Sequence, residues 1–200
     1  MYYRLSFNLD DYEKLRKNNA MFINAKKSNM KTLEFPNIKK GFFDKIIYQR
    51  EITIDWPKII FYYNSDEASK ESDFLFNIKF WPIIHKRVIE KIQETNFKGL
   101  AFYPIELVDE ITNNINSNYY LMYTQNFIDA YDMQKSKYYY NEEYDFYTFI
   151  PRQCYLNQEV CSGYDVFRCE KSPATLFVSD RFKQLVDDNN FTNFSFDPQL

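Results

Sequence analysis

Glycine and histidine are scarce in this 200-residue chain, which has three glycines, Gly41, Gly99 and Gly163, and a single histidine, His85. Loops that cradle phosphate groups need closely spaced glycines, so the sequence contains no loop of that kind. Nucleophilic and metal chemistry usually recruit histidine, and no catalytic motif surrounds His85. We interpret His85 as a surface residue at the start of a helix. The sequence predicts no catalytic residue and no enzyme activity.

Cysteine is also scarce. Cys154, Cys161 and Cys169 are separated by seven and eight residues, which fits neither a disulfide framework nor a metal-binding pair. We expect three free thiols in a reducing cytoplasm, with no metal and no cofactor. Acidic residues interrupt any apolar signal segment near the N-terminus, and no apolar run is long enough to cross a bilayer. These features predict a cytoplasmic protein without membrane contact.

The chain has no strong overall charge, because 25 basic residues stand against 28 acidic ones. A net charge of −3 excludes the basic balance of a general nucleic-acid binder. The charge is unevenly distributed: residues 1–50 carry 11 basic and 5 acidic side chains, whereas residues 101–150 carry 2 basic and 8 acidic ones. We therefore expect a bipolar molecule that does not bind nucleic acid directly.

Aromatic residues are abundant, with 20 Phe, 18 Tyr and 2 Trp. Tyrosines and acids are interspersed in the segment 138–145. Tyrosine supplies large contact area at a low cost in side-chain entropy. This composition suits a protein interface. The predicted partner-binding residues are Tyr138, Tyr140, Glu142, Glu143, Tyr144 and Asp145. A hydrated hairpin or loop whose aromatic rings close the edge of the core is the alternative interpretation.

Strand patterns are short. Alternation over residues 3–9 predicts a half-buried strand, and Asp10 with Glu13 resembles a capping box that would begin a short helix. Further strands are predicted at 59–63, 74–78, 118–132 and 146–153, which are rich in Tyr, Phe, Ile and Thr. The rest of residues 1–72 shows no sustained period, so its structure is left open within a single domain of residues 1–200.

The most informative feature is an internal similarity between residues 83–104 and 177–198, which align without a gap at an offset of 94. Five aligned pairs are identical. Each copy has apolar residues on one helical face, at Ile84, Val88 and Ile92 in the first and at Val178, Phe182, Leu185 and Val186 in the second. Gly99 and Asn193, types that tolerate left-handed backbone, would end each helix, and a short strand closed by proline would follow.

This pattern predicts an α+β fold, in which an internal strand-helix-strand duplication places two equivalent amphipathic helices, near 84–95 and 178–189, on a mixed sheet. Chance similarity between two amphipathic helices is the alternative explanation.

Several segments also carry a family resemblance: Trp81 to Pro104, Ile128 to Asp132 with Ser136, Tyr164 to Arg168, and Leu176 to Pro198. Together they resemble a family of immunity proteins from bacterial polymorphic toxin systems, over roughly residues 73–200. The sequence departs from the family pattern at His85, where a small capping residue is typical, and at Asn193, where glycine is typical.

The resemblance implies a non-catalytic protein that binds and neutralises a cognate toxin, encoded by an adjacent gene, in the cytoplasm. The missing catalytic constellation and the segment 138–145 agree with this implication. The alternative from another class is an aromatic-rich ligand-binding module for a carbohydrate or a nucleotide.

Overall fold

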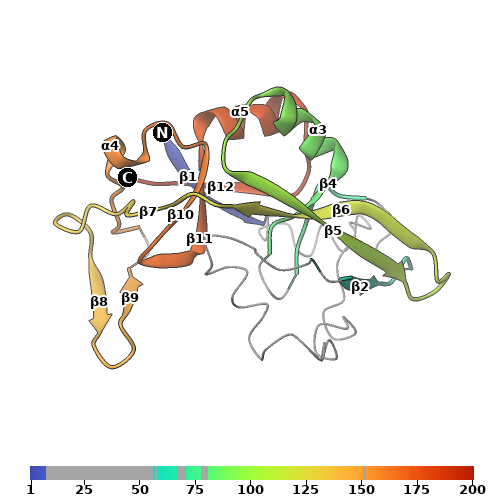
Figure 1. The fold of residues 1–200 in the computed structure, drawn as a ribbon, viewed down its shortest axis with the longest axis horizontal. Coiled ribbons are helices and arrows are strands. Elements are labelled where there is room, and N and C mark those ends of the chain that lie inside the picture. Colours follow the sequence, from blue (N-terminus) through green and yellow to red (C-terminus); the bar gives the residue numbers. More distant parts are fainter. Residues whose placement is uncertain (8–55, 57, 67–70, 78–80, 151) are drawn as a thin grey trace.

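The computed structural model describes residues 1–7, 56, 58–66, 71–77, 81–150 and 152–200. The predicted helix that begins at Asp10 lies outside these residues. The elements are, in chain order, β1 (Tyr2–Phe7), β2 (Ile60–Tyr63), β3 (Phe74–Leu75), β4 (Ile83–His85), α3 (Lys86–Glu94), β5 (Leu100–Asp109), β6 (Ile115–Thr124), β7 (Phe127–Ile128), β8 (Tyr138–Asn141), β9 (Phe146–Phe149), α4 (Gln158–Cys161), β10 (Val166–Cys169), β11 (Ser172–Ser179), α5 (Asp180–Asp188) and β12 (Phe194–Pro198) (Figure 1).

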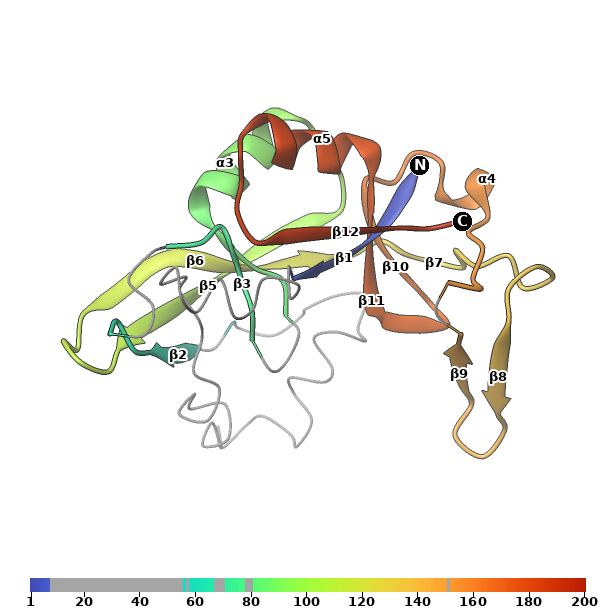
Figure 2. The same ribbon diagram turned by 180° about the vertical axis from the view of Figure 1, so that it is seen from behind.

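The strands form two five-stranded sheets and a separate two-stranded hairpin. Sheet 1 has the order β12-β1-β11-β10-β7, and sheet 2 has the order β2-β5-β6-β4-β3. Both are mixed, because β7 is parallel to β10 and β2 is parallel to β5, whereas their other neighbours are antiparallel. Helices α3 and α5 lie side by side on the same side of the sheets (Figure 1, Figure 2). The fold is α+β, with two mixed sheets where one was expected.

Strand β1 is the second strand of sheet 1, between β11 and β12 from the other end of the chain. Its predicted alternation is confirmed over the described residues: Leu5 and Phe7 are buried and Arg4 is exposed. Because β1 pairs with both β11 and β12, residues nearly 200 positions apart in the sequence are direct neighbours.

The two segments related by the offset of 94 have the same structure. Helix α3 follows β4 and precedes β5, and helix α5 follows β11 and precedes β12, with both helices nine residues long. In each unit a third strand lies between the flanking two and antiparallel to both. Leu121 of β6 pairs with Ile83 and Tyr103, and Arg4 of β1 pairs with Phe177 and Asp197 at the equivalent positions. That these units arose by duplication remains a proposal.

The ends of the helices differ from the prediction by a few residues. Asn96 and Asn190, which follow the two C-caps, have φ of 59° and 51° and so supply the left-handed position directly after each helix. Gly99 and Asn193 also have positive φ, 71° and 69°, but they lie directly before the following strands, β5 and β12. Asparagine and glycine tolerate this backbone region better than other residues.

The apolar faces of α3 and α5 share one core. Val88, Ile92, Phe182 and Val186 pack in a single buried cluster with residues of both sheets, including Leu5. The units also exchange contacts symmetrically: the Arg87 guanidinium lies 5.1 Å from the Phe191 ring centroid, and that of Arg181 lies 5.1 Å from the Phe97 centroid. Neither unit could bury its helix alone, so the core forms only when both are present.

Four predicted strand ends were wrong: the strand predicted at 146–153 ends at Phe149, and the other three ends have a local reason. Polar side chains end two strands early: Asn77 donates to Leu75 O and Trp81 O, and Asn126 donates to Lys98 O and Val166 O. Strand β3 therefore ends at Leu75 and β6 at Thr124. Pro104 does not close β5, because β2 pairs with β5 only from Glu106 onward and no other described residue pairs with that side of β5 at Pro104, where proline is tolerated.

His85 lies at the start of α3, as predicted, but its side chain is mostly buried rather than on the surface. Its Nδ1 accepts a hydrogen bond from the Arg87 N–H at 3.3 Å, and its ring packs edge-on against Tyr119 with centroids 5.1 Å apart. Ser179 caps α5 at the equivalent position, accepting from the Phe182 N–H. Nδ1 can accept a hydrogen bond only when the histidine is neutral. Helix α3 therefore has a cap that depends on protonation.

Acid is expected to weaken this cap. Burial lowers the pKa of His85, and Arg87 and Lys86 lower it further, against the opposing effects of Glu71 and Asp73. The unfolded chain then takes up a proton before the folded chain does, so stability falls as pH drops below about 6.5. His85→Ser, which copies the cap at Ser179, should remove about 1 kcal/mol of that pH dependence. Urea unfolding at about pH 7.5 and 5.5 tests this; equal losses in both proteins would contradict it.

Candidate functional site

Strands β8 and β9 form a hairpin that projects from the body of the molecule, on the side away from α3 and α5 (Figure 1, Figure 2). Tyr138 lies opposite Phe149 and Tyr140 lies opposite Tyr147, so these four rings share one face. Ring centroids of Tyr140 and Tyr147 are 4.7 Å apart, and those of Tyr138 and Phe149 are 5.7 Å apart. The hairpin therefore has one continuous aromatic face.

At the base of the hairpin, aromatic rings pack onto the core. Phe149 stacks on buried Tyr131 with centroids 3.9 Å apart, and Tyr131 packs edge-on against buried Phe177 of sheet 1. Farther along the hairpin the aromatic side chains are open to solvent. Tyr139 is 70% exposed and Phe146 is 53% exposed. Exposed aromatic area of this kind is typical of interaction surfaces, which agrees with the predicted interface.

The turn of the hairpin holds the acidic residues. Asp145 has φ of 47° and accepts a hydrogen bond from the Tyr140 hydroxyl at 2.8 Å, a bond that raises the pKa of Tyr140. The Asn141 side chain accepts from the Tyr144 N–H. Glu142 and Glu143 are exposed on the same turn. The tip is thus a structured turn that presents carboxylates to solvent.

The structure brings all six predicted residues together on this one hairpin. Tyr138 and Tyr140 lie on the aromatic face, while Glu142, Glu143, Tyr144 and Asp145 form the tip. The hairpin geometry was part of the alternative interpretation, but its rings do not close the core except at Phe149. Binding of a partner at these residues remains a prediction.

The sequence predicted an interface on residues 138–147, but Tyr139, Phe146 and Tyr147 were not named as partner-binding residues. The run of aromatic residues was visible, but the face on which each ring lies depends on how β8 pairs with β9. The strand predicted at 146–153 contained part of this information. Its pairing with residues 138–141 was not predicted.

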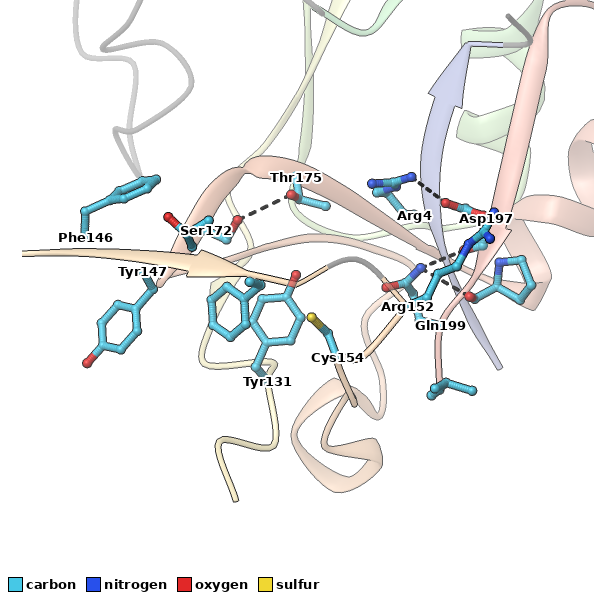
Figure 3. Close-up of a pocket in the computed structure, with 14 residues that line it drawn as sticks. Arg4, Tyr131, Phe146, Tyr147, Arg152, Cys154, Ser172, Thr175, Asp197 and Gln199 are labelled. Carbon is cyan, nitrogen blue, oxygen red and sulfur yellow. Dashed lines mark hydrogen bonds and ion pairs between the residues drawn. The ribbon is translucent and has the colours of Figure 1, made fainter. Parts of the chain in front are cut away.

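A cleft of about 520 Å³ lies between the hairpin and sheet 1 (Figure 3). One wall is β9 with Tyr131 beneath it, and the other wall comes from β11, β1 and the residues after β12. Ser172 and Thr175 of β11 contribute hydroxyl groups, and Arg4 of β1 forms an ion pair with Asp197 of β12. This volume is in the range of ligand and side-chain binding sites.

Arg152 also lines the cleft, and it is exposed with φ of 62°. The other arginines in the described part of the chain donate to acceptors: Arg4 to Asp197, Arg87 to Asp73, Arg181 to Asp165, and Arg168 to two backbone carbonyls. Among those same residues, Arg152 makes no hydrogen bond or ion pair. It therefore adds an uncompensated positive charge to the cleft.

The three cysteines are free thiols and all are buried. Burial raises the pKa of each, and that of Cys161 reaches about 12. A thiol with such a pKa stays protonated at neutral pH and is a poor nucleophile or metal ligand. In the residues that the structure describes, no three His, Cys, Asp or Glu side chains are grouped to hold a metal ion. None of the helices there has the length and apolar character needed to cross a membrane.

Comparison with known proteins identifies the family of this chain. No curated protein matches the chain. The family model that does match is that of the Immunity protein family (Imm11), over residues 5–200. The match reaches farther toward the N-terminus than the resemblance over residues 73–200, so it includes most of the segment whose structure the sequence left open. Because it covers nearly the whole length, the chain belongs to the immunity protein family Imm11.

Proposed function

We propose that this chain is a non-catalytic immunity protein that binds a cognate toxin in the cytoplasm and neutralises it. The observation that carries this proposal is membership of the Imm11 family over residues 5–200. The projecting hairpin supports it, because exposed tyrosines and carboxylates on a structured turn suit a protein partner.

In this proposal the tip of the hairpin is the first point of contact. Toxins that act on nucleic acids or nucleotides need cationic sites, and Glu142, Glu143 and Asp145 would attract such a site. Long-range attraction raises the association rate, and charge-assisted hydrogen bonds form on contact. Tyr138, Tyr140 and Tyr144 would then lose their solvent-exposed area against the toxin. The same carboxylates repel phosphate, so no direct binding of nucleic acid is expected.

The toxin is expected to be encoded by an adjacent gene and to act on an intracellular target. Co-expression tests the proposal: cells that produce the toxin domain should survive only when this chain is also produced, and the two proteins should co-purify. A neighbouring toxin that acts only on the cell wall would contradict the cytoplasmic site. Protection without any complex would contradict neutralisation by binding.

A triple variant tests the acidic tip. Replacing Glu142, Glu143 and Asp145 by alanine should slow association about tenfold at low salt and weaken its salt dependence, since steering by surface charge is screened by ions. Stopped-flow or surface-based kinetics at two salt concentrations measures both effects. The matched control removes three acids from the helices instead, at Glu90, Glu94 and Asp188. Equal rates for the two triple variants would place the interface elsewhere.

A further inference from the structure

Among the residues that the structure describes, none pairs with the outer backbone edge of strand β9. The Ile150 N–H donates to Lys137 O at 3.0 Å, so the pair 137–150 is hydrogen-bonded. Hydrogen-bonded and non-hydrogen-bonded pairs alternate along an antiparallel ladder. The pairs Tyr138–Phe149 and Tyr140–Tyr147 are therefore of the second type. The N–H and C=O groups of Tyr147 and Phe149 consequently point away from β8.

That edge borders the cleft. Four consecutive residues of β9, 146–149, line it, although their side chains alternate between the two faces of the hairpin. A cleft that touches all four lies against the edge of the strand rather than one face. In both ribbon views β9 is between β8 and the body of the molecule (Figure 1, Figure 2). The opposite wall, with Ser172 and Thr175, is shown in Figure 3.

We propose that this cleft receives an extended segment of the toxin, which pairs with β9 as a third strand and places a carboxylate against Arg152. This inference rests on the proposed function and specifies how the partner is held. Addition of a strand to an exposed edge is a general mode of peptide recognition: main-chain hydrogen bonds supply affinity, and the adjoining side-chain sites supply specificity.

Three observations favour this occupant. An isolated two-stranded hairpin is only marginally stable in water. A third strand at the β9 edge would turn it into a three-stranded sheet. Arg152 lacks an acceptor among the described residues and lines the same cleft, so a carboxylate is the complementary group. The cleft also begins next to the hairpin tip proposed to meet the toxin, since Phe146 lines the cleft and directly follows Asp145 of the tip.

A proline substitution at the β9 edge tests the strand pairing. Tyr147→Pro removes the outward N–H without removing a β8–β9 hydrogen bond, and Tyr147→Ala removes the same ring but keeps the N–H. Affinity for the toxin domain of the adjacent gene is measured with both full-length variants by calorimetry. The proline variant should bind at least tenfold more weakly than the alanine variant. Equal affinities would overturn the strand pairing.

Charge reversal tests the second contact. Arg152→Glu should weaken toxin binding at least tenfold, because it replaces the attraction for a carboxylate by repulsion. Lys98→Glu makes the same change in net charge at an exposed lysine outside the cleft, and it should bind within twofold of wild type. If the two reversals have the same effect, the carboxylate contact is wrong.

Amide hydrogen exchange tests the strand pairing in the wild-type protein, because it measures whether the N–H groups of β9 are hydrogen-bonded. In the free chain the amides of Tyr147 and Phe149 should exchange quickly and that of Thr148 slowly, and the complex should protect all three. Slow exchange at 147 and 149 before binding would show an edge already paired. A complex that forms without new protection there would overturn the inference and leave the proposed function intact, whereas absence of any complex would contradict the proposed function itself.

Discussion

Replacing Asp73 by alanine is expected to lower the free energy of unfolding by about 3 kcal/mol. The Asp73 carboxylate is buried and accepts hydrogen bonds from the Arg87 guanidinium and from the N–H and hydroxyl of Thr192. Alanine would leave these donors without an acceptor in a site that joins the first strand-helix-strand unit to the second. Urea unfolding at neutral pH measures the loss.

The pH dependence distinguishes this ion pair from simple packing. Burial alone would raise the pKa of Asp73, but the hydrogen bonds from Arg87 and Thr192 outweigh it and hold the pKa below its usual value. Its contribution to stability is therefore present above about pH 4 and is lost as pH falls through the lowered pKa. The alanine variant should lack that acid-induced loss.

The second unit provides the matched control. Asp165 occupies a comparable place, accepting from the Ser179 hydroxyl and from Arg181, but it is less buried and its arginine is more exposed. In the variant, water can accept the hydrogen bonds that Ser179 and Arg181 donate to Asp165. Asp165→Ala should therefore lower the free energy of unfolding by only about 1 kcal/mol. Equal losses for Asp73→Ala and Asp165→Ala would show that burial does not decide the strength of these pairs.

Replacing Tyr144 by alanine is expected to weaken toxin binding about 30-fold, which corresponds to about 2 kcal/mol. Tyr144 is 71% exposed at the hairpin tip, so it can lose more area on binding than the tyrosines already packed against their neighbours. Its N–H bond to Asn141 is retained in the variant, because only the side chain is removed. Calorimetric titration of the toxin domain gives the affinity.

Tyr139→Ala is the control, since Tyr139 is equally exposed on the same hairpin but lies on the face opposite to Tyr138 and Tyr140. We expect a change below about threefold there. A larger loss at Tyr139 than at Tyr144 would mean that the toxin contacts the opposite face, and the predicted set of anchors would then be wrong.

The sequence by itself determined the features that depend on neighbouring residues. Both long helices were predicted, because their apolar spacing and the cap at Ser179 are properties of a few consecutive residues. The equivalence of the two units was visible as an offset of 94. The resemblance to immunity proteins rested on these same segments, and the family match confirmed it over a longer range.

Pairing of distant strands was decided by the tertiary structure alone. The pattern of residues 3–9 predicted a strand, but nothing local in it indicated that β1 would lie between β11 and β12. The pairing partner of a strand depends on complementary edges and shared burial across the whole chain, and a period of two is compatible with many partners.

For the candidate site too, the sequence showed the local features and the tertiary structure decided the rest. Composition identified the tyrosines and acids of 138–145, because a dense local run is visible without any structure. The cleft and the isolated charge of Arg152 were not visible, since they require β9, β11 and β1 to meet. Which rings share a face, and which edge of β9 is open, follow from the register between β8 and β9, and hydrogen bonds between strands set that register.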